Sequence, residues 1–108
     1  MNDKIIIRKD FSDSPVARYC EDGPFSGEEF YEKLLKPKFI KAKENGTKLE
    51  IDLDGVWGYP SSFVSGSFGK LSINYTPSEV LSVIIFISEE SETRKNRIIS
   101  EIKNPTIK

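Results

Sequence analysis

The sequence contains no histidine and only one cysteine, Cys20. The absence of histidine excludes Ser-His-Asp and Cys-His nucleophile pairs, histidine general bases and histidine metal ligands. A single cysteine cannot form a disulfide within the chain, which is consistent with a reducing compartment. We therefore expect a protein that is not an enzyme and that carries neither a metal nor another cofactor.

Long apolar runs and an excess of one charge are also missing. No run approaches the roughly 20 residues that span a bilayer, and the first ten residues, MNDKIIIRKD, have too short an apolar segment for a signal peptide. Sixteen basic and seventeen acidic residues give a net charge of −1, so no global positive field favours duplex nucleic acid. The phosphate-binding patterns GxxxxGK[ST] and GxGxxG do not occur. We expect a cytoplasmic protein that neither inserts into a membrane nor binds duplex nucleic acid.

The chain length suits a single domain. Its 108 residues can bury a core without disulfides, and no repeat or low-complexity linker divides them. Asn104 and Pro105 should end the last helix, so the tail from about residue 104 is expected to be free. Residues 1–108 are therefore expected to form one domain.

Three segments have the apolar patterns of strands. Ile5 to Ile7 form a short β-branched run, residues 49–53 (LEIDL) alternate apolar and acidic residues, and residues 81–87 (LSVIIFI) are almost continuously apolar. The alternating segment predicts a strand covered on one face, whereas the continuous run predicts a central strand covered on both faces. We expect Val16 to Cys20 to pair back on the first strand as an antiparallel edge strand.

Capping residues mark the first of about three expected helices. Ser26 and Glu29 form an S-x-x-E capping box, and Phe25 and Phe30 occupy the positions of a hydrophobic staple. A helix should therefore begin within about two residues of Ser26.

The remaining helices complete an alternating order of elements. Pro37 should kink or restart the first helix, which is expected to end near Asn45. A middle helix should follow the second strand, and a final helix is expected from about Ser88 to Lys103. Strands alternating with helices favour an α/β fold with a mostly parallel sheet.

The middle helix, in GYPSSFVSGSFGKL (residues 58–71), is rich in small residues. One helical face carries Phe63, Val64, Phe68 and Leu71, and the rest carries Ser65, Gly66, Ser67 and Gly69. An interior glycine costs a helix about 1 kcal/mol relative to alanine, so these residues need an explanation. The helix can pack closely on its neighbours, or its bare surface can admit a partner or let the helix shift, and both explanations can hold at once.

The same region resembles a known family. LEIDLDGVWGYPSSFVSGSFGKL (residues 49–71) resembles the central strand, turn and helix of STAS domains, named for sulfate transporters and anti-sigma factor antagonists. Together with GPFSGEEFYEKLLKP (residues 23–37), it is similar to the bacterial STAS-like domain family of unknown function. The resemblance covers about residues 17–75. It implies a single STAS-like α/β domain that acts as a regulatory protein-binding module.

The resemblance also implies a switch. In STAS antagonists, the serine at this helix start is phosphorylated by an anti-sigma factor with a histidine-kinase-type ATPase fold, and the modification controls binding of the two proteins. By position, Ser62 and Ser61 are the implied phosphorylation sites, with Asp52 and Asp54 as supporting residues on the preceding strand. Such an ATPase is the implied partner.

Two positions depart from the STAS motif around these serines. Pro60 replaces the aspartate that precedes them, and Phe63 replaces the glycine that follows them. A simpler interpretation of Ser61 and Ser62 is that they cap the helix, because serine is a favoured N-cap residue.

The expected partner surface surrounds the serines. It consists of Trp57, Tyr59, Ser61, Ser62, Phe63, Ser65 and Gly66. Large aromatics with polar groups are common interface anchors, although Trp57 and Tyr59 would equally well cover the end of the core. Two alternatives remain: a small-molecule or nucleotide binder at the carboxyl ends of the strands, and a small enzyme that uses Ser62 or the two aspartates.

Overall fold

The computed structural model describes residues 3–12, 26–56 and 58–105. Strands β1 (Asp3–Ile6), β2 (Leu49–Asp52) and β3 (Ile84–Ile87) form a sheet in the order β1-β2-β3. β2 pairs in parallel with both neighbours, so that Ile51 lies opposite Ile5 on one side and Phe86 on the other. The expected α/β class with a parallel sheet is confirmed.

The described residues contain five continuous helical segments instead of about three. The elements are α1 (Ile7–Asp10); α2 (Gly27–Phe30), the π-helical turn η2 (Tyr31–Leu35) and α3 (Lys36–Asn45); α4 (Ser61–Val64), the π-helical turn η3 (Ser65–Gly69) and α5 (Lys70–Tyr75); α6 (Pro77–Val83); and α7 (Glu92–Lys103). α2, η2 and α3 follow one another without a break and form the first long helix. α4, η3 and α5 likewise form the second long helix.

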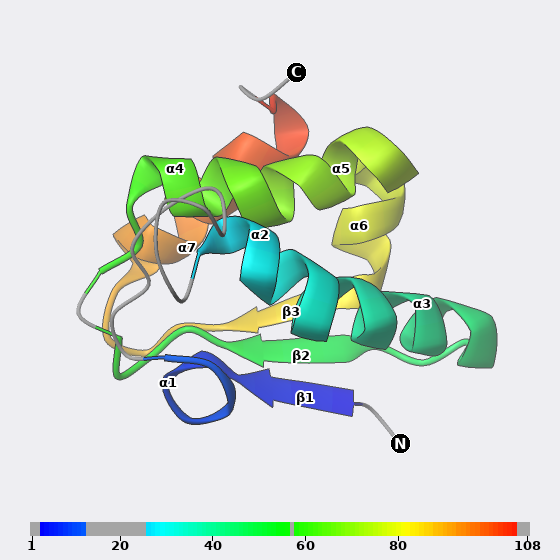
Figure 1. Cartoon of the computed structure of the whole chain (residues 1–108), viewed down its shortest axis with the longest axis horizontal. Coiled ribbons are helices and arrows are strands. Elements are labelled where there is room, and N and C mark those ends of the chain that lie inside the picture. The colour runs from blue at the N-terminus through cyan, green and yellow to red at the C-terminus, as the bar shows by residue number, and fades with distance from the viewer. Residues whose placement is uncertain (1–2, 13–25, 57, 106–108) are drawn as a thin grey trace.

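The two long helices and α7 lie together on one face of the sheet (Figure 1). Ile5, Leu49 and Ile51 are fully buried beneath them. The opposite face is open, because Ile85 is 44% exposed and Ile6 and Ile87 are only half-buried. The molecule therefore has two layers, with the core between the helices and one face of the sheet.

The apolar run at residues 81–87 does not form a central strand. Its first half belongs to α6, and its second half is β3, which lies at an edge of the sheet. α6 begins after Thr76, whose hydroxyl oxygen accepts a hydrogen bond of 3.3 Å from the N–H of Glu79. The prediction was wrong because the end of a partly buried helix and a short strand follow each other without a polar break.

The expected antiparallel edge strand is also corrected, because the described sheet is entirely parallel and β1 itself occupies the edge. The chain leaves the sheet directly after Ile6, whose N–H donates a 2.8 Å hydrogen bond to the Asp10 carboxylate in α1. Val16 to Cys20, Phe25 of the expected staple and the last three residues lie outside the described residues.

The first long helix follows its capping signals. Ser26 is the N-cap, and its hydroxyl oxygen accepts a 3.1 Å hydrogen bond from the N–H of Glu29. The helix ends at Asn45, followed by Gly46 in the left-handed conformation, φ 68°. Pro37 does not interrupt it. In a regular α-helix, a proline ring clashes with the carbonyl of the residue four positions earlier. For Pro37 that residue lies in η2, where the π-helical turn is wider than an α-helical one.

α7 is shorter at its start than expected. Its N-cap is Ser91, whose hydroxyl oxygen accepts a 3.3 Å hydrogen bond from Arg94 N–H, so the helix begins at Glu92 and not near Ser88. Its end at Lys103 agrees with the stop expected from Asn104 and Pro105. None of the helices in the described part of the chain is long and apolar enough to cross a membrane.

Close packing explains the small residues of the second long helix, which packs between α2 and α7 (Figure 1). A Cβ atom on Gly27 of α2 would lie 2.5 Å from the carbonyl oxygen of Phe63, and one on Gly69 would lie 2.8 Å from a carboxylate oxygen of Glu101 in α7. Ser65 and Ser67 are buried, and the Ser67 hydroxyl donates a 2.7 Å hydrogen bond to the Phe63 carbonyl. The neighbouring helices of the same chain thus cover the bare surface.

We predict that Gly27→Ala destabilises the protein by about 1–3 kcal/mol, the range for overpacking a core. Alanine normally favours a helix over glycine by up to about 1 kcal/mol, but here the added methyl would meet a backbone carbonyl that cannot move by itself. Chemical denaturation would measure the change. Gly58→Ala is the control, because no heavy atom apart from those of its chain neighbours lies within 4 Å of a Cβ there; equal stability of the two variants would contradict the packing argument.

Candidate functional site

Ser61 and Ser62 form the first turn of the second long helix. Pro60 occupies the N-cap position with ψ 144°, and no side chain caps this helix. The first hydrogen bond of the helix backbone runs from Val64 N–H to the Pro60 carbonyl, at 3.1 Å. Within the described residues, the preceding N–H groups of the turn have no acceptor. The two serines therefore lie at the helix start as expected, but neither of them is its cap.

The residues expected to form the partner surface differ in how far the structure buries them. Ser61 is exposed and Ser62 is half-buried. By contrast, the core or the helix contacts bury Tyr59, Phe63, Ser65 and Gly66. Their own chain already covers these four residues, so Ser61 and Ser62 are the members of the expected surface that the described structure leaves accessible; Trp57 lies outside the described residues.

Tyr59 anchors the turn that leads to the serines. Its hydroxyl donates a 2.9 Å hydrogen bond to the Leu53 carbonyl, and its ring lies 6.1 Å from the Phe63 ring, centroid to centroid. The Arg94 guanidinium lies over the Tyr59 ring at 5.9 Å. Burial raises the pKa of the Tyr59 hydroxyl far above its ordinary value, so the residue stays neutral in the folded protein.

Asp52 and Asp54 support two loops at the carboxyl ends of β2 and β3. Asp52 accepts a 2.9 Å hydrogen bond from Asp54 N–H and forms a 3.2 Å ion pair with Arg8. The Asp54 carboxylate accepts hydrogen bonds from the N–H groups of Glu89 and Glu90, at 2.9 and 3.0 Å. The two aspartates thereby join the loop before Ser61 to the loop before α7. These bonds give them a positioning role and do not arrange them as an acid and base pair.

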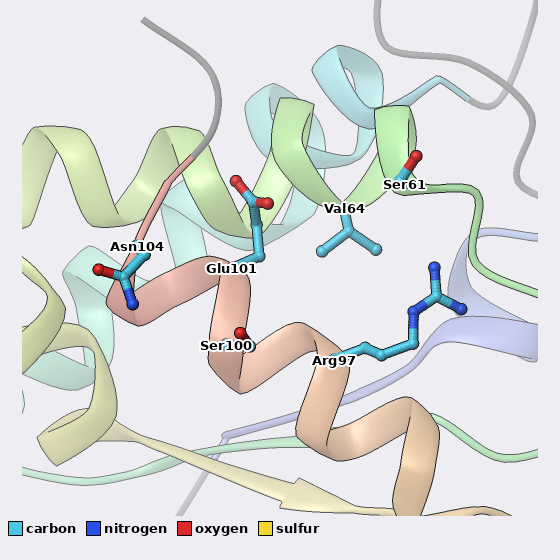
Figure 2. Close-up of a pocket in the computed structure, with 6 residues that line it drawn as sticks. All are labelled: Ser61, Val64, Arg97, Ser100, Glu101 and Asn104. Atoms are coloured by element: carbon cyan, nitrogen blue, oxygen red, sulfur yellow. The ribbon is translucent and has the colours of Figure 1, made fainter.

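Ser61 also lines a pocket that no pattern in the sequence predicts. The pocket has a volume of about 190 Å³ and is lined by Ser61, Val64, Arg97, Ser100, Glu101 and Asn104. Figure 2 shows Ser61 and Arg97 at one end of it, Glu101 and Asn104 at the other, and Val64 between them. Four of the lining residues come from α7 and its C-cap, and their helical spacing places them on one polar face: Arg97, Ser100, Glu101 and Asn104. Their spacing alone does not say that the face lies opposite Ser61.

A second cleft lies at the carboxyl edge of the sheet, where the small-ligand alternative places a binding site. It has a volume of about 260 Å³ and is lined by Gly55, Val56, Glu90 and Arg94. Arg94 donates a 2.7 Å hydrogen bond to the Val56 carbonyl, and Glu90 accepts one from the Gly55 N–H. The charged groups of this cleft are thus already engaged. Across the described ranges, no three acidic or cysteine residues come together as a metal site.

A family model matches the part of the chain that contains the serines and aspartates described above. Residues 26–94 match the family model of the STAS-like domain of unknown function (DUF4325). No curated protein and no solved structure gave a significant match. The matched range includes both serines and both aspartates, whereas Arg97 and the rest of the α7 side of the pocket lie just beyond it.

We predict that Tyr59→Phe lowers the free energy of unfolding at pH 7 by about 1–2 kcal/mol, because the Leu53 carbonyl loses its buried donor. Unfolding the wild type exposes a tyrosine with an ordinary pKa of about 10. The stability that depends on a neutral Tyr59 is thus complete below that pH and falls as the pH rises above it. The difference between the two proteins should therefore narrow above about pH 10.

Urea titrations at pH 7 and above about pH 10 measure these stabilities. Tyr75→Phe is the matched control at each pH. Tyr75 is half-buried, and its hydroxyl has no hydrogen bond to another residue of the described chain. Its loss should change the stability by less than about 0.5 kcal/mol. Equal effects of the two substitutions would show that the Tyr59 hydrogen bond does not hold the turn.

Proposed function

Because the chain belongs to the STAS-like domain family of unknown function, we propose that it is a bacterial cytoplasmic regulatory module that binds a protein partner and is switched by serine phosphorylation at the start of α4. One observation carries the proposal. An exposed serine begins a long helix without capping it, and the first N–H groups of that helix have no acceptor in the described structure.

Phosphorylation at this position is compatible with the fold. A phosphoserine carries about −1.5 to −2 charges at pH 7 and three strong acceptor oxygens. Negative charge at a helix N-terminus is favourable, because the helix dipole is positive at that end and the free N–H groups there can donate hydrogen bonds to an anion. Ser61 is exposed, so no buried group has to move. Ser62 is half-buried and is the second candidate.

The partner would contact a surface that shares Ser61 with the one the sequence indicated but extends across the pocket to α7. The exposed groups near the switch are Pro60 and Ser61 from the start of α4, with Arg97 and Ser100 across the pocket on α7. We propose that the partner is a protein with a histidine-kinase-type ATPase domain, which phosphorylates the serine and binds the unmodified form. A phosphate would then add charge to the centre of the contact and weaken it.

The two alternatives receive less support. A small-ligand site at the carboxyl ends of the strands would need free polar groups, but Asp52, Asp54 and Arg94 already bind backbone groups there. An enzyme using Ser62 or the aspartates lacks a base placed beside a nucleophile among these contacts. We therefore propose a binding role without catalysis.

We predict that Ser61→Asp and Ser62→Asp weaken partner binding at least about tenfold, which corresponds to about 1.4 kcal/mol. Ser61→Ala and Ser62→Ala should keep wild-type affinity and abolish phosphorylation at the respective site. Thermal melting of the aspartate variants should stay close to wild type, since the new charge lies at a helix N-terminus. Ser78→Asp is the control, because Ser78 is exposed like Ser61 and is the second residue of its helix like Ser62, while its helix, α6, is distant from α4 in Figure 1.

The experiment begins with capture of the partner from the native host and intact-mass analysis of the captured chain. A mass increase of one phosphoryl group, mapped to Ser61 or Ser62 by fragmentation, is the expected result. Each variant is then titrated against the purified partner. Equal affinities for wild type and all four variants, or a phosphate mapped elsewhere, would reject the switch.

A further inference from the structure

Two chemically complementary side chains face the pocket described above from different helices. Ser61 comes from the start of α4, and Arg97 comes from the middle of α7. Figure 2 shows the hydroxyl and the guanidinium at the same end of the pocket. Within the described residues, Arg97 takes part in no hydrogen bond or ion pair. Its guanidinium is thus available to an anion that forms beside it.

We infer that Arg97 receives the phosphate of phosphorylated Ser61, so that the modification ties α4 to α7 and closes the pocket. The inference rests on the proposed function for the modification itself and adds its receptor. The planar guanidinium donates paired N–H groups that match two phosphate oxygens, which makes arginine better suited to this contact than lysine.

The other charged groups near the pocket do not take this role. Arg94 lies one turn earlier in α7 and is engaged by the Val56 carbonyl and the Tyr59 ring. The Glu101 carboxylate would repel a phosphate, but Figure 2 shows it on the far side of Val64 from Ser61 and Arg97. The charge arrangement thus directs a phosphate on Ser61 towards Arg97.

The chemical step is an ordinary phosphoryl transfer. The Ser61 oxygen attacks the γ-phosphorus of a nucleoside triphosphate held by the partner kinase, and the bond from that phosphorus to the bridging oxygen breaks. The nucleoside diphosphate leaves, and the proton of the hydroxyl passes to a base of the kinase or to water. The product is a dianionic group in a pocket of about 190 Å³. A partner side chain that enters the pocket in the unmodified form would be excluded after the transfer.

The test uses the full chain with phosphoserine encoded genetically at position 61, which does not require the partner kinase. The matched control carries phosphoserine at position 62, on the same helical turn but outside the pocket lining. Both phosphoproteins and the unmodified chain are prepared with Arg97 and with Arg97→Gln. Arg97 is exposed, so the substitution alone should leave folding intact.

We expect phosphorylation at position 61 to raise the melting temperature by about 2–6 °C in the Arg97 background. The rise should disappear in Arg97→Gln and at high salt, because an exposed ion pair is screened. Phosphorus NMR should show that the second pKa of the position-61 phosphate lies below its usual value of about 6 and returns to it in Arg97→Gln. The position-62 phosphate should respond to Arg97 much less.

Equal melting shifts and equal phosphate titrations with Arg97 and with Arg97→Gln would overturn the inference. Measuring how the captured partner binds to the same proteins distinguishes failure of this inference from failure of the proposed function. If the position-61 phosphate blocks the partner in both backgrounds while Arg97 has no effect on the phosphate, the switch stands and the arginine receptor fails. If Arg97 responds to the phosphate but partner affinity is unchanged, the receptor stands and the proposed function fails.

Discussion

The structure depends on the close approach of the second long helix to its neighbours. The Phe63 carbonyl fills the space where any side chain larger than glycine at position 27 would lie, and Glu101 of α7 approaches Gly69 from another side. The facing side chains form an aromatic cluster, with the Phe30 ring 5.6 Å from Phe63 and 5.8 Å from Phe68 between centroids. These contacts fix both the axial position and the rotation of the helix, and hence the place where Ser61 emerges.

A polar network at the carboxyl edge of the sheet supplies the other constraint. Asp54 binds the backbone of the loop that leads into α7, and Arg8 bridges the Asp52 carboxylate and the Asp54 carbonyl. The loops that deliver the two walls of the pocket thus share one set of anchors. The small-residue helix and the aspartates, which the sequence suggests as parts of a binding surface, act in the structure to position the start of α4 and the start of α7.

Local signals predicted the elements whose ends are chemically marked. The Ser26 and Glu29 capping box placed the first helix, and Gly46 placed its end. The alternation of residues 49–53 placed the buried face of β2, where Leu49 and Ile51 are fully buried, as is Leu53 directly after the strand. The same logic would have found α6, because Thr76 and Glu79 repeat the capping pattern. The apolar run that follows was instead assigned to one strand, since composition alone does not divide a run between a helix and an edge strand.

The sequence by itself determined the α/β class, the family and the location of two serines at a helix start, because caps, alternation and short motifs depend on neighbours along the chain. Only the tertiary structure decided that Ser61 is exposed while Tyr59, Phe63, Ser65 and Gly66 are buried. It alone placed Arg97, 36 positions after Ser61, on the same pocket. Such a pairing follows from how α7 packs on the second long helix, and long-range packing depends on the shape of the whole core, which no local pattern encodes.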